Sequence, residues 1–254
     1  MKFSVCIDIM WPQEEFLEGM ETVRAAGLSA YEFWNWQGKD LDAIFRRQQE
    51  LGLTPAAFCT KEWNLVDPEQ RGTFLEGLKE SLAAAGRLGC KTLISQVGSA
   101  MPGVSRERQT ESIIQGLKAA APLLEDAGVR LAFEPLNAIN HGGYFLERSG
   151  DALEIAEAVD SPWVTILFDF YHQQITEGDL IRRSLSMLGR IGHVHCAGNP
   201  GRHELDIGEI RYDAVFRALR DNGYSGFLGL EYSPTRDRLT ELRKLAQMEA
   251  DFAK

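Results

Sequence analysis

The stretch RERQTESIIQGLKAAAPLLEDAGVRLAFE, residues 106–134, contains a helix pattern followed directly by a strand pattern. Residues 106–127 have the periodicity of a helix, and residues 129–134 form a short apolar run that predicts a strand. Gly128 lies between them, where a left-handed residue commonly ends a helix. A glycine ends other predicted helices in the same way, at Gly27, Gly52, Gly89 and Gly223. The helix-to-strand unit therefore recurs along the chain.

Eight short apolar, β-branched or aromatic runs are predicted to be strands. They cover residues 3–9, 30–34, 54–59, 92–97, 129–134, 163–170, 191–197 and 226–231. Periodic segments after them predict helices over residues 12–26, 41–51, 68–88, 106–127, 151–159, 179–188, 212–222 and 238–252. This alternation is typical of βαβ units and of a parallel sheet.

The length of the chain favours a closed barrel over an open sheet. Its 254 residues, divided among eight units, give about 32 residues a unit, as a barrel of roughly 250 residues requires. A doubly wound sheet is the rival, but no G-x-G-x-x-G or G-x-x-x-x-G-K-[ST] loop follows a predicted strand. We therefore predict an α/β fold, a single (β/α)8 TIM-barrel domain over residues 1–254, with the active site at the carboxyl ends of the strands.

Charge and cysteine content exclude several classes of protein. Lys and Arg number 27 against 37 Asp and Glu, which gives a net charge of −10 and disfavours binding to nucleic acid or to anionic membranes. No apolar run is long enough to span a membrane, and the amino terminus lacks the pattern of a signal peptide. The four cysteines are scattered without a CxxC pair, as expected of reduced thiols. We expect a cytoplasmic enzyme with no nucleic-acid or membrane partner.

Each of the last four predicted strands ends in, or carries near its end, a side chain that can perform chemistry: Glu134, Asp169, His195 and Glu231. Any one of the carboxylates could instead be a helix cap or a salt-bridge partner. Because the strands of a barrel converge, however, three acids and an imidazole would meet there and repel one another unless a cation lay between them. The oxygen-rich set favours Mg²⁺ or Mn²⁺, with Co²⁺ or Zn²⁺ as alternatives.

Further polar residues near these strand ends are candidates for substrate binding. All five histidines lie between residues 141 and 203. His172, three residues after Asp169, is placed to orient substrate or a metal ligand, whereas His193 is better explained as a hydrogen-bonded core residue. Asn137 either binds substrate or caps a helix. The loop after the seventh strand adds Arg202, His203 and Glu209, and its arginine could bind a substrate carboxylate or pair with acidic neighbours. Trp11, Trp34, Trp36 and Trp63 could wall a pocket or pack a subunit interface.

Motifs over nearly the whole chain resemble the hydroxypyruvate isomerase branch of the xylose-isomerase-like TIM barrels. They are EPLN (134–137), HGGYFL (141–146), DFYHQQI (169–175), GHVH (192–195), PGRHELDIGEIRY (200–212) and GYSGFLGLEY (223–232). The resemblance implies one divalent metal held by Glu134, Asp169, residue 195 and Glu231, with Glu134 and Glu231 also the acid/base pair. It further implies a homo-oligomer, dimer or tetramer.

One ligand position departs from this branch. The hydroxypyruvate isomerases that this chain resembles carry Gln at the position of His195, whereas His at that position resembles the ketose 3-epimerases. The further substrate glutamate of those epimerases has no counterpart, because Asn140 and His141 occupy the region.

These observations predict a metal-dependent sugar isomerase of carbohydrate metabolism. It would act through an enediolate on a small sugar or hydroxy-keto acid, converting hydroxypyruvate to tartronate semialdehyde. The alternative is a ketose 3-epimerase of the tagatose/psicose type, and a more remote one is a non-catalytic sugar-binding barrel. The apurinic endonuclease relatives of the barrel need more histidine ligands and a basic DNA-binding face, which a net charge of −10 argues against.

Overall fold

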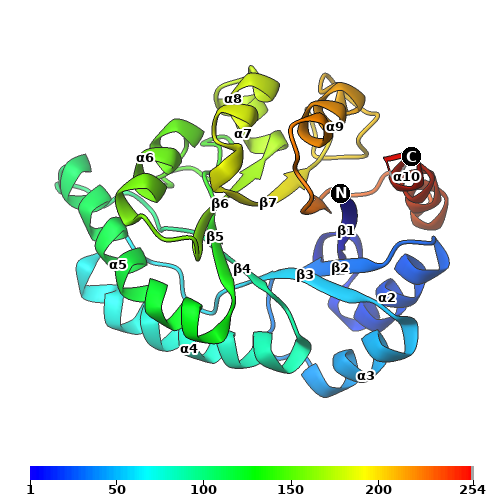
Figure 1. The fold of residues 1–254 in the computed structure, drawn as a ribbon, viewed down its shortest axis with the longest axis horizontal. Coiled ribbons are helices and arrows are strands. Elements are labelled where there is room, and N and C mark those ends of the chain that lie inside the picture. Colours follow the sequence, from blue (N-terminus) through cyan, green and yellow to red (C-terminus); the bar gives the residue numbers. More distant parts are fainter. Residues whose placement is uncertain (253–254) are drawn as a thin grey trace.

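The computed structural model describes residues 1–252 and forms a closed barrel of eight parallel strands, ordered β1 to β8 as in the sequence (Figure 1). The strands are β1 (Lys2–Cys6), β2 (Ala30–Phe33), β3 (Thr54–Cys59), β4 (Thr92–Ser95), β5 (Arg130–Phe133), β6 (Val164–Asp169), β7 (Ile191–Cys196) and β8 (Phe227–Leu230). The predicted α/β TIM-barrel fold is confirmed. No helix among the described residues is long and apolar enough to cross a membrane.

The helices cover the outside of the barrel (Figure 1). They are α1 (Ile7–Met10), α2 (Phe16–Ala25), α3 (Leu41–Leu51), α4 (Arg71–Leu88), α5 (Arg106–Ala127), α6 (Ser149–Val159), α7 (Phe170–Thr176), α8 (Leu180–Ser186), α9 (Tyr212–Asp221) and α10 (Arg238–Phe252), with 3-10 turns η1 (Gln13–Glu15), η2 (Pro68–Gln70) and η3 (Leu188–Arg190). The helices predicted over 41–51, 106–127 and 238–252 match to the residue. Gly52 and Gly128 take the left-handed C-cap conformation that the sequence pattern predicts.

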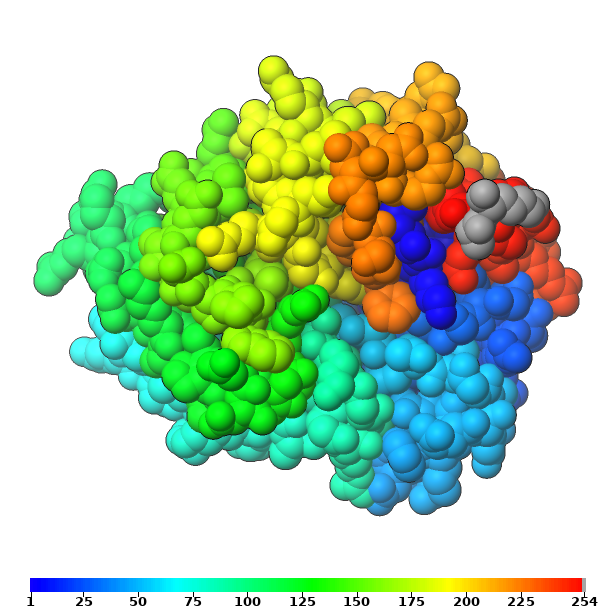
Figure 2. All heavy atoms as spheres, in the orientation of Figure 1, coloured from blue at the N-terminus to red at the C-terminus, as the bar shows by residue number. Residues whose placement is uncertain are grey.

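The barrel closes where the first strand meets the last. β1 pairs with β8 in a register that runs from Lys2 opposite Phe227 to Val5 opposite Leu230. The backbone N–H of Phe3 also donates to Glu249 of α10 at 2.5 Å. Figure 2 shows the blue amino-terminal residues lying between the orange segment that includes β8 and the red α10. The two ends of the chain therefore complete the barrel together.

Two short helices, α1 and α7, begin where the first and sixth predicted strands are expected to continue. The strand predicted over 3–9 ends at Cys6, because α1 turns the chain so that Asp8 accepts from the backbone N–H of Trp34 and pairs with Lys39 at 2.8 Å. The strand predicted over 163–170 ends at Asp169, whose Oδ1 accepts from the backbone N–H of Tyr171 at 2.8 Å and so caps α7. A side-chain cap satisfies a helix N–H that would otherwise lack a partner.

The interior of the barrel is apolar on one side and polar on the other. Ala57, Ile94, Ala132 and Leu167, one from each of β3 to β6, form a buried apolar layer. Across from it, Ser4, Glu32, His193 and His195 are buried on β1, β2 and β7. The polar half adjoins the strand ends that carry the predicted site.

Candidate active site

The four predicted ligands meet at the carboxyl end of the barrel. Glu134 directly follows β5, Asp169 ends β6, His195 lies on β7 and Glu231 directly follows β8. Strand register places Asp169 opposite His195. His195 Nδ1 is 3.0 Å from Glu231 Oε2 and 4.0 Å from Glu134 Oε1. All four side chains are buried, so their charges act on one another with little screening by water.

Three of these residues have the arrangement of a cation site. Glu134, Asp169 and His195 each offer one ligand atom, and these atoms lie within 4.8 Å of one another. Glu134 Oε1 and His195 Nδ1 are buried without a hydrogen-bond partner, and a bound cation would satisfy both. Glu231 lies outside this set of three but contacts His195. The residues fit a divalent metal with mixed oxygen and imidazole ligands.

Glu231 is held by two donors. The Trp34 indole Nε1 and the Arg202 guanidinium each donate to its carboxylate, and His195 Nδ1 lies close to the same group at the distance given above. Arg202 Nη2 also lies 3.4 Å from Asp169 Oδ2, so the guanidinium bridges two of the predicted ligands. Although burial opposes the shift, Arg202 and His195 lower the pKa of Glu231 well below its usual range.

Glu134 has the opposite shift. Burial raises its pKa well above the usual range, and the attraction of His195 does not offset this. Two carboxyl groups whose environments separate their pKa values can serve as the acid and the base of one reaction.

His172 presents a neutral imidazole to the site. Its Nδ1 accepts from the backbone N–H of Asn137 at 3.3 Å, and the Asn137 side-chain amide lies 2.6 Å from the same atom. The Nε2 atom therefore carries the proton; it is buried without a hydrogen-bond partner and lies 3.4 Å from Asp169 Oδ2. Burial lowers the pKa of His172 to about 4. Asn137 lies behind His172 as its support, and its own Oδ1 accepts from the N–H of Asn140 at 2.9 Å.

A cavity of about 310 Å³ opens onto these groups. Glu134, Glu231, His172 and Arg202 line it, with Trp34 and Trp63 among the walls. Two other predicted binding residues lie elsewhere. Glu209 is exposed and accepts from Asn199 and Gln174, and His203 Nδ1 lies 2.9 Å from the carbonyl oxygen of Ser233. Neither of them lines the cavity.

Among the cavity residues that the sequence does not single out are Cys59, Lys61 and Gln96. They lie at or just after the ends of β3 and β4. The same rule that picks out the ends of the last four strands applies to them, so their position was the signal that could have found them.

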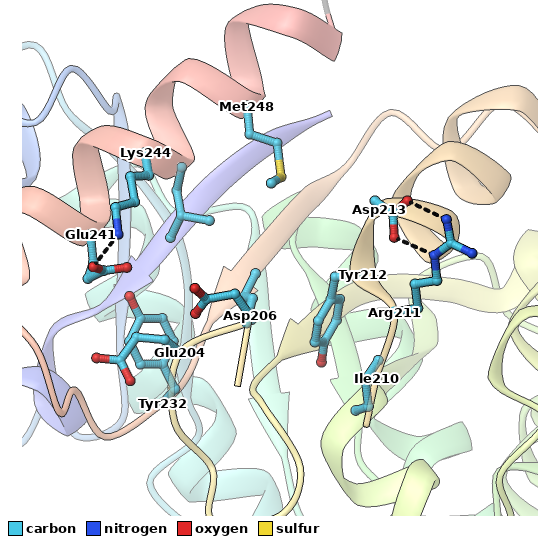
Figure 3. Close-up of a pocket in the computed structure, with 12 residues that line it drawn as sticks. Glu204, Asp206, Ile210, Arg211, Tyr212, Asp213, Tyr232, Glu241, Lys244 and Met248 are labelled. Carbon is cyan, nitrogen blue, oxygen red and sulfur yellow. Dashed lines mark hydrogen bonds and ion pairs between the residues drawn. The ribbon is translucent and has the colours of Figure 1, made fainter. Parts of the chain in front are cut away.

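A second cavity, of about 340 Å³, lies outside the barrel between α10 and the segment from Glu204 to Asp213 (Figure 3). Four of its charged groups pair with one another, Glu241 with Lys244 at 2.6 Å and Asp213 with Arg211 at 3.1 Å, and Glu204 and Asp206 bind Thr235 and Arg236. The inner cavity, by contrast, is lined by Glu134 and His172, and each of them has a buried side-chain atom, Oε1 and Nε2 respectively, that lacks a hydrogen-bond partner. We therefore identify the inner cavity as the candidate active site.

Comparison with known proteins places these features in a family. The family model described as xylose isomerase-like TIM barrel matches residues 18–252. The chain is 29% identical to 2-oxo-tetronate isomerase of Haemophilus influenzae, over 95% of this chain and 96% of that protein. It is 27% identical to hydroxypyruvate isomerase of Escherichia coli, over 92% and 94%. A crystal structure from Brucella melitensis titled AP endonuclease, family 2, superposes with a TM-score of 0.92 at 30% identity and covers 98% of this chain and 99% of that one.

Proposed function

The chain belongs to the family of xylose isomerase-like TIM barrels, and we propose that it is an isomerase that moves a carbonyl group between adjacent carbons of a small hydroxy-keto acid, with hydroxypyruvate as the first candidate substrate. The observation that carries the proposal is that Glu134 and Glu231, from β5 and β8, line one cavity at the carboxyl end of the barrel. Removing a proton from a carbon and returning one to its neighbour needs such a pair.

The proton transfers follow from these two carboxyl groups. One glutamate takes the proton from the carbon that bears the hydroxyl, and the C–H electron pair becomes the carbon–carbon double bond of an enediolate. The carbonyl π pair moves onto the oxygen, which the other glutamate can protonate. Return of a proton to the former carbonyl carbon, with loss of the proton from the original hydroxyl, completes the conversion of hydroxypyruvate to tartronate semialdehyde.

Other residues hold the substrate and the charges in place. His172 lines the cavity, and its Nε2–H, which has no hydrogen-bond partner, is available to donate to a substrate oxygen. Trp34 and Arg202 keep the Glu231 carboxylate ionised and oriented. Trp34 and Trp63 exclude water from part of the wall, which strengthens the electrostatic interactions inside.

Glu134, Asp169 and His195, together with Glu231, would hold one divalent cation, with Mg²⁺ or Mn²⁺ favoured. When bound, this cation supplies polarisation of the substrate oxygens and stabilises the negative charge that develops on them. We expect EDTA to abolish activity and Mn²⁺ or Mg²⁺ to restore it. Full activity after verified removal of the metal would contradict the metal requirement.

The charge of the cavity supports an acidic substrate. Lys61 and Arg202 both line it, and the ion pair of Lys61 with Glu80 is partly exposed and therefore weak. Lys61 is thus free to turn toward a substrate carboxylate. The substrates in the names of both curated relatives are 2-oxo acids that carry a hydroxyl on the next carbon, and this shared unit is the one that the proposed reaction needs.

The decisive experiment follows the reaction by NMR in D2O with hydroxypyruvate, 2-oxo-tetronate and a series of ketoses. For isomerisation, deuterium should appear on the former carbonyl carbon of the product. Deuterium on the carbon that lost its proton, with inverted configuration, would identify the alternative, a ketose 3-epimerase, which His195 favours. Binding without exchange of any substrate proton would instead indicate a sugar-binding barrel.

A further inference from the structure

A buried carboxylate lies directly behind His195 and belongs to none of the predicted site residues. Glu32, on β2, is 1% exposed. Its Oε2 accepts from the Ser4 hydroxyl at 2.7 Å and lies 2.9 Å from His193 Nε2. Its Oε1 lies 3.0 Å from His195 Nε2. Ser4 of β1 and His193 of β7 thus hold one oxygen in place and leave the other facing His195.

The close approach of Glu32 and His195 depends on β8, the strand that pairs with β7. Gly229 of β8 is opposite both His195 and Ser4 in the strand register. A Cβ atom at residue 229 would lie 2.5 Å from Glu32 Oε1 and 2.5 Å from His195 Cδ2. Only glycine leaves room there for the carboxylate and the ring to approach. The contact is therefore built by residues of β1, β2, β7 and β8 together.

The two nitrogens of His195 consequently have different surroundings. Nε2 lies 3.0 Å from Glu32 Oε1, and because an ionised carboxylate only accepts hydrogen bonds, Nε2 can bond to it only when Nε2 carries the proton. The Nδ1 atom faces Glu134 and Glu231. Among the described residues, neither ring nitrogen nor Oε1 of Glu32 has a hydrogen-bond partner, so the two nitrogens differ in the groups that they face.

We propose that Glu32 is a positioning residue that holds His195 with its proton on Nε2, so that Nδ1 presents its lone pair to the cation site of Glu134 and Asp169. A carboxylate behind a histidine ligand fixes the ring and makes the ligating nitrogen more basic. The inference rests on the proposed metal site and adds to it a residue that does not itself touch the cation. His193 and Ser4 fix Glu32 in turn.

The first test measures Mn²⁺ binding by calorimetry in wild type, Glu32→Gln and Glu177→Gln. Glu177 is an equally buried carboxylate, with a side chain 1% exposed, but it binds Ser149 and Arg183 outside the barrel interior. We expect Glu32→Gln to weaken Mn²⁺ binding by roughly 10- to 100-fold and Glu177→Gln to leave it unchanged. An unchanged affinity in folded Glu32→Gln overturns the proposal. Absence of Mn²⁺ binding in wild type would overturn the metal site itself.

The second test needs no Glu32 variant and so remains decisive if that variant fails to fold. The chain has five histidines, so ¹⁵N-histidine NMR can follow each ring, and the His195→Gln variant identifies the signals of residue 195. On addition of diamagnetic Zn²⁺, we expect Nδ1 of His195 to shift as a metal ligand while Nε2 stays protonated. Metal binding through Nε2 would overturn the proposal.

Discussion

Trp34 donates its indole N–H to Oε1 of Glu231, a residue 197 positions away in the sequence. The contact joins the end of β2 to the end of β8, and Asp8 secures the Trp34 end by accepting from its backbone N–H at 2.9 Å. With Oε1 occupied by Trp34, the other oxygen of Glu231 faces His195 and Arg202. Trp34 is thus part of the proposed acid/base apparatus as well as of the cavity wall.

Replacing Trp34 with Phe should therefore impair catalysis while preserving an aromatic wall. A hydrogen bond to a charged group contributes about 1.5–3 kcal/mol, so we expect kcat/KM to fall roughly 10- to 100-fold. Trp36→Phe is the matched control, because its indole donates to Ser81 at 3.3 Å and does not contact Glu231. Steady-state kinetics decide the matter, and equal effects of the two substitutions would contradict the assignment.

The paired glutamates can be tested by isosteric amides. Glu134→Gln and Glu231→Gln each remove an ionisable group without changing its size, and we expect kcat to fall by about 10²–10⁴ in each. Glu76→Gln, at a side chain 71% exposed and paired only with Lys79, should retain wild-type kcat. Metal content and circular dichroism must accompany the rates, since either glutamine could also weaken cation binding. Near wild-type turnover by either variant would remove that residue from the mechanism.

The sequence was sufficient to predict which four side chains come together because each of them stands at or near the end of an apolar strand. Glu134, Asp169, His195 and Glu231 could be located by counting strands alone, since a barrel brings all strand ends to one axis. Glu32 could not be found in this way. Glu32 lies within a strand, between two aromatic residues. In sequence, an acid on the solvent-facing side of a strand has the same pattern, so the pattern does not indicate a buried carboxylate. Its partner His193 is 161 residues away.

The loop residues were harder to place than the strand residues. Arg202, His203 and Glu209 follow β7 closely in the sequence, yet only Arg202 lines the cavity. A loop has no fixed periodicity, so sequence spacing does not say which side chain points inward. The left-handed backbone of Arg202, with φ of 57°, contributes to its direction and is not visible in the sequence.

Lys61 should contribute to recognition of an acidic substrate. We expect Lys61→Gln to raise KM for hydroxypyruvate roughly tenfold, the equivalent of about 1.4 kcal/mol, with a smaller effect on kcat. Lys79→Gln removes a lysine in a similar ion pair, also 2.7 Å long, but outside the cavity, and should leave KM unchanged. An unchanged KM in Lys61→Gln would assign carboxylate binding to another group.

The cysteines should react slowly with thiol reagents in the native protein. Cys6, Cys90 and Cys196 are buried and Cys59 is half-buried, and burial raises the pKa of each thiol, for Cys90 to about 12. The reactive thiolate is therefore scarce near neutral pH. We expect slow labelling by a disulfide reagent at pH 8, first at Cys59, which lines the cavity, and labelling of all four in guanidinium. Rapid labelling of Cys6, Cys90 or Cys196 in the folded protein would contradict this burial.

Gly192 should be needed for the packing of β7 against β6. The strand register shifts between Ile166 and Leu167 of β6, whose partners are Ile191 and His193, so Gly192 is the extra residue of a bulge. A Cβ atom at residue 192 would lie 2.0 Å from Thr165 Oγ1 and 2.7 Å from Thr165 Cβ. Since β7 also carries His193 and His195, movement there would disturb the proposed site.

We expect Gly192→Ala to lower the free energy of unfolding by about 1–3 kcal/mol, as overpacking of a filled interior does. Thr165→Ala removes the nearest clashing atom, so the double variant should recover part of the loss relative to the sum of the single variants. Gly86→Ala is the control: a Cβ there meets nothing within 4 Å on helix α4, and the substitution should stabilise the helix by roughly 0.5–1 kcal/mol. Urea unfolding of the four variants measures these differences. If Gly192→Ala were as stable as Gly86→Ala, the bulge would have to accommodate a side chain, and the close packing of Gly192 against Thr165 would not constrain the position of His195.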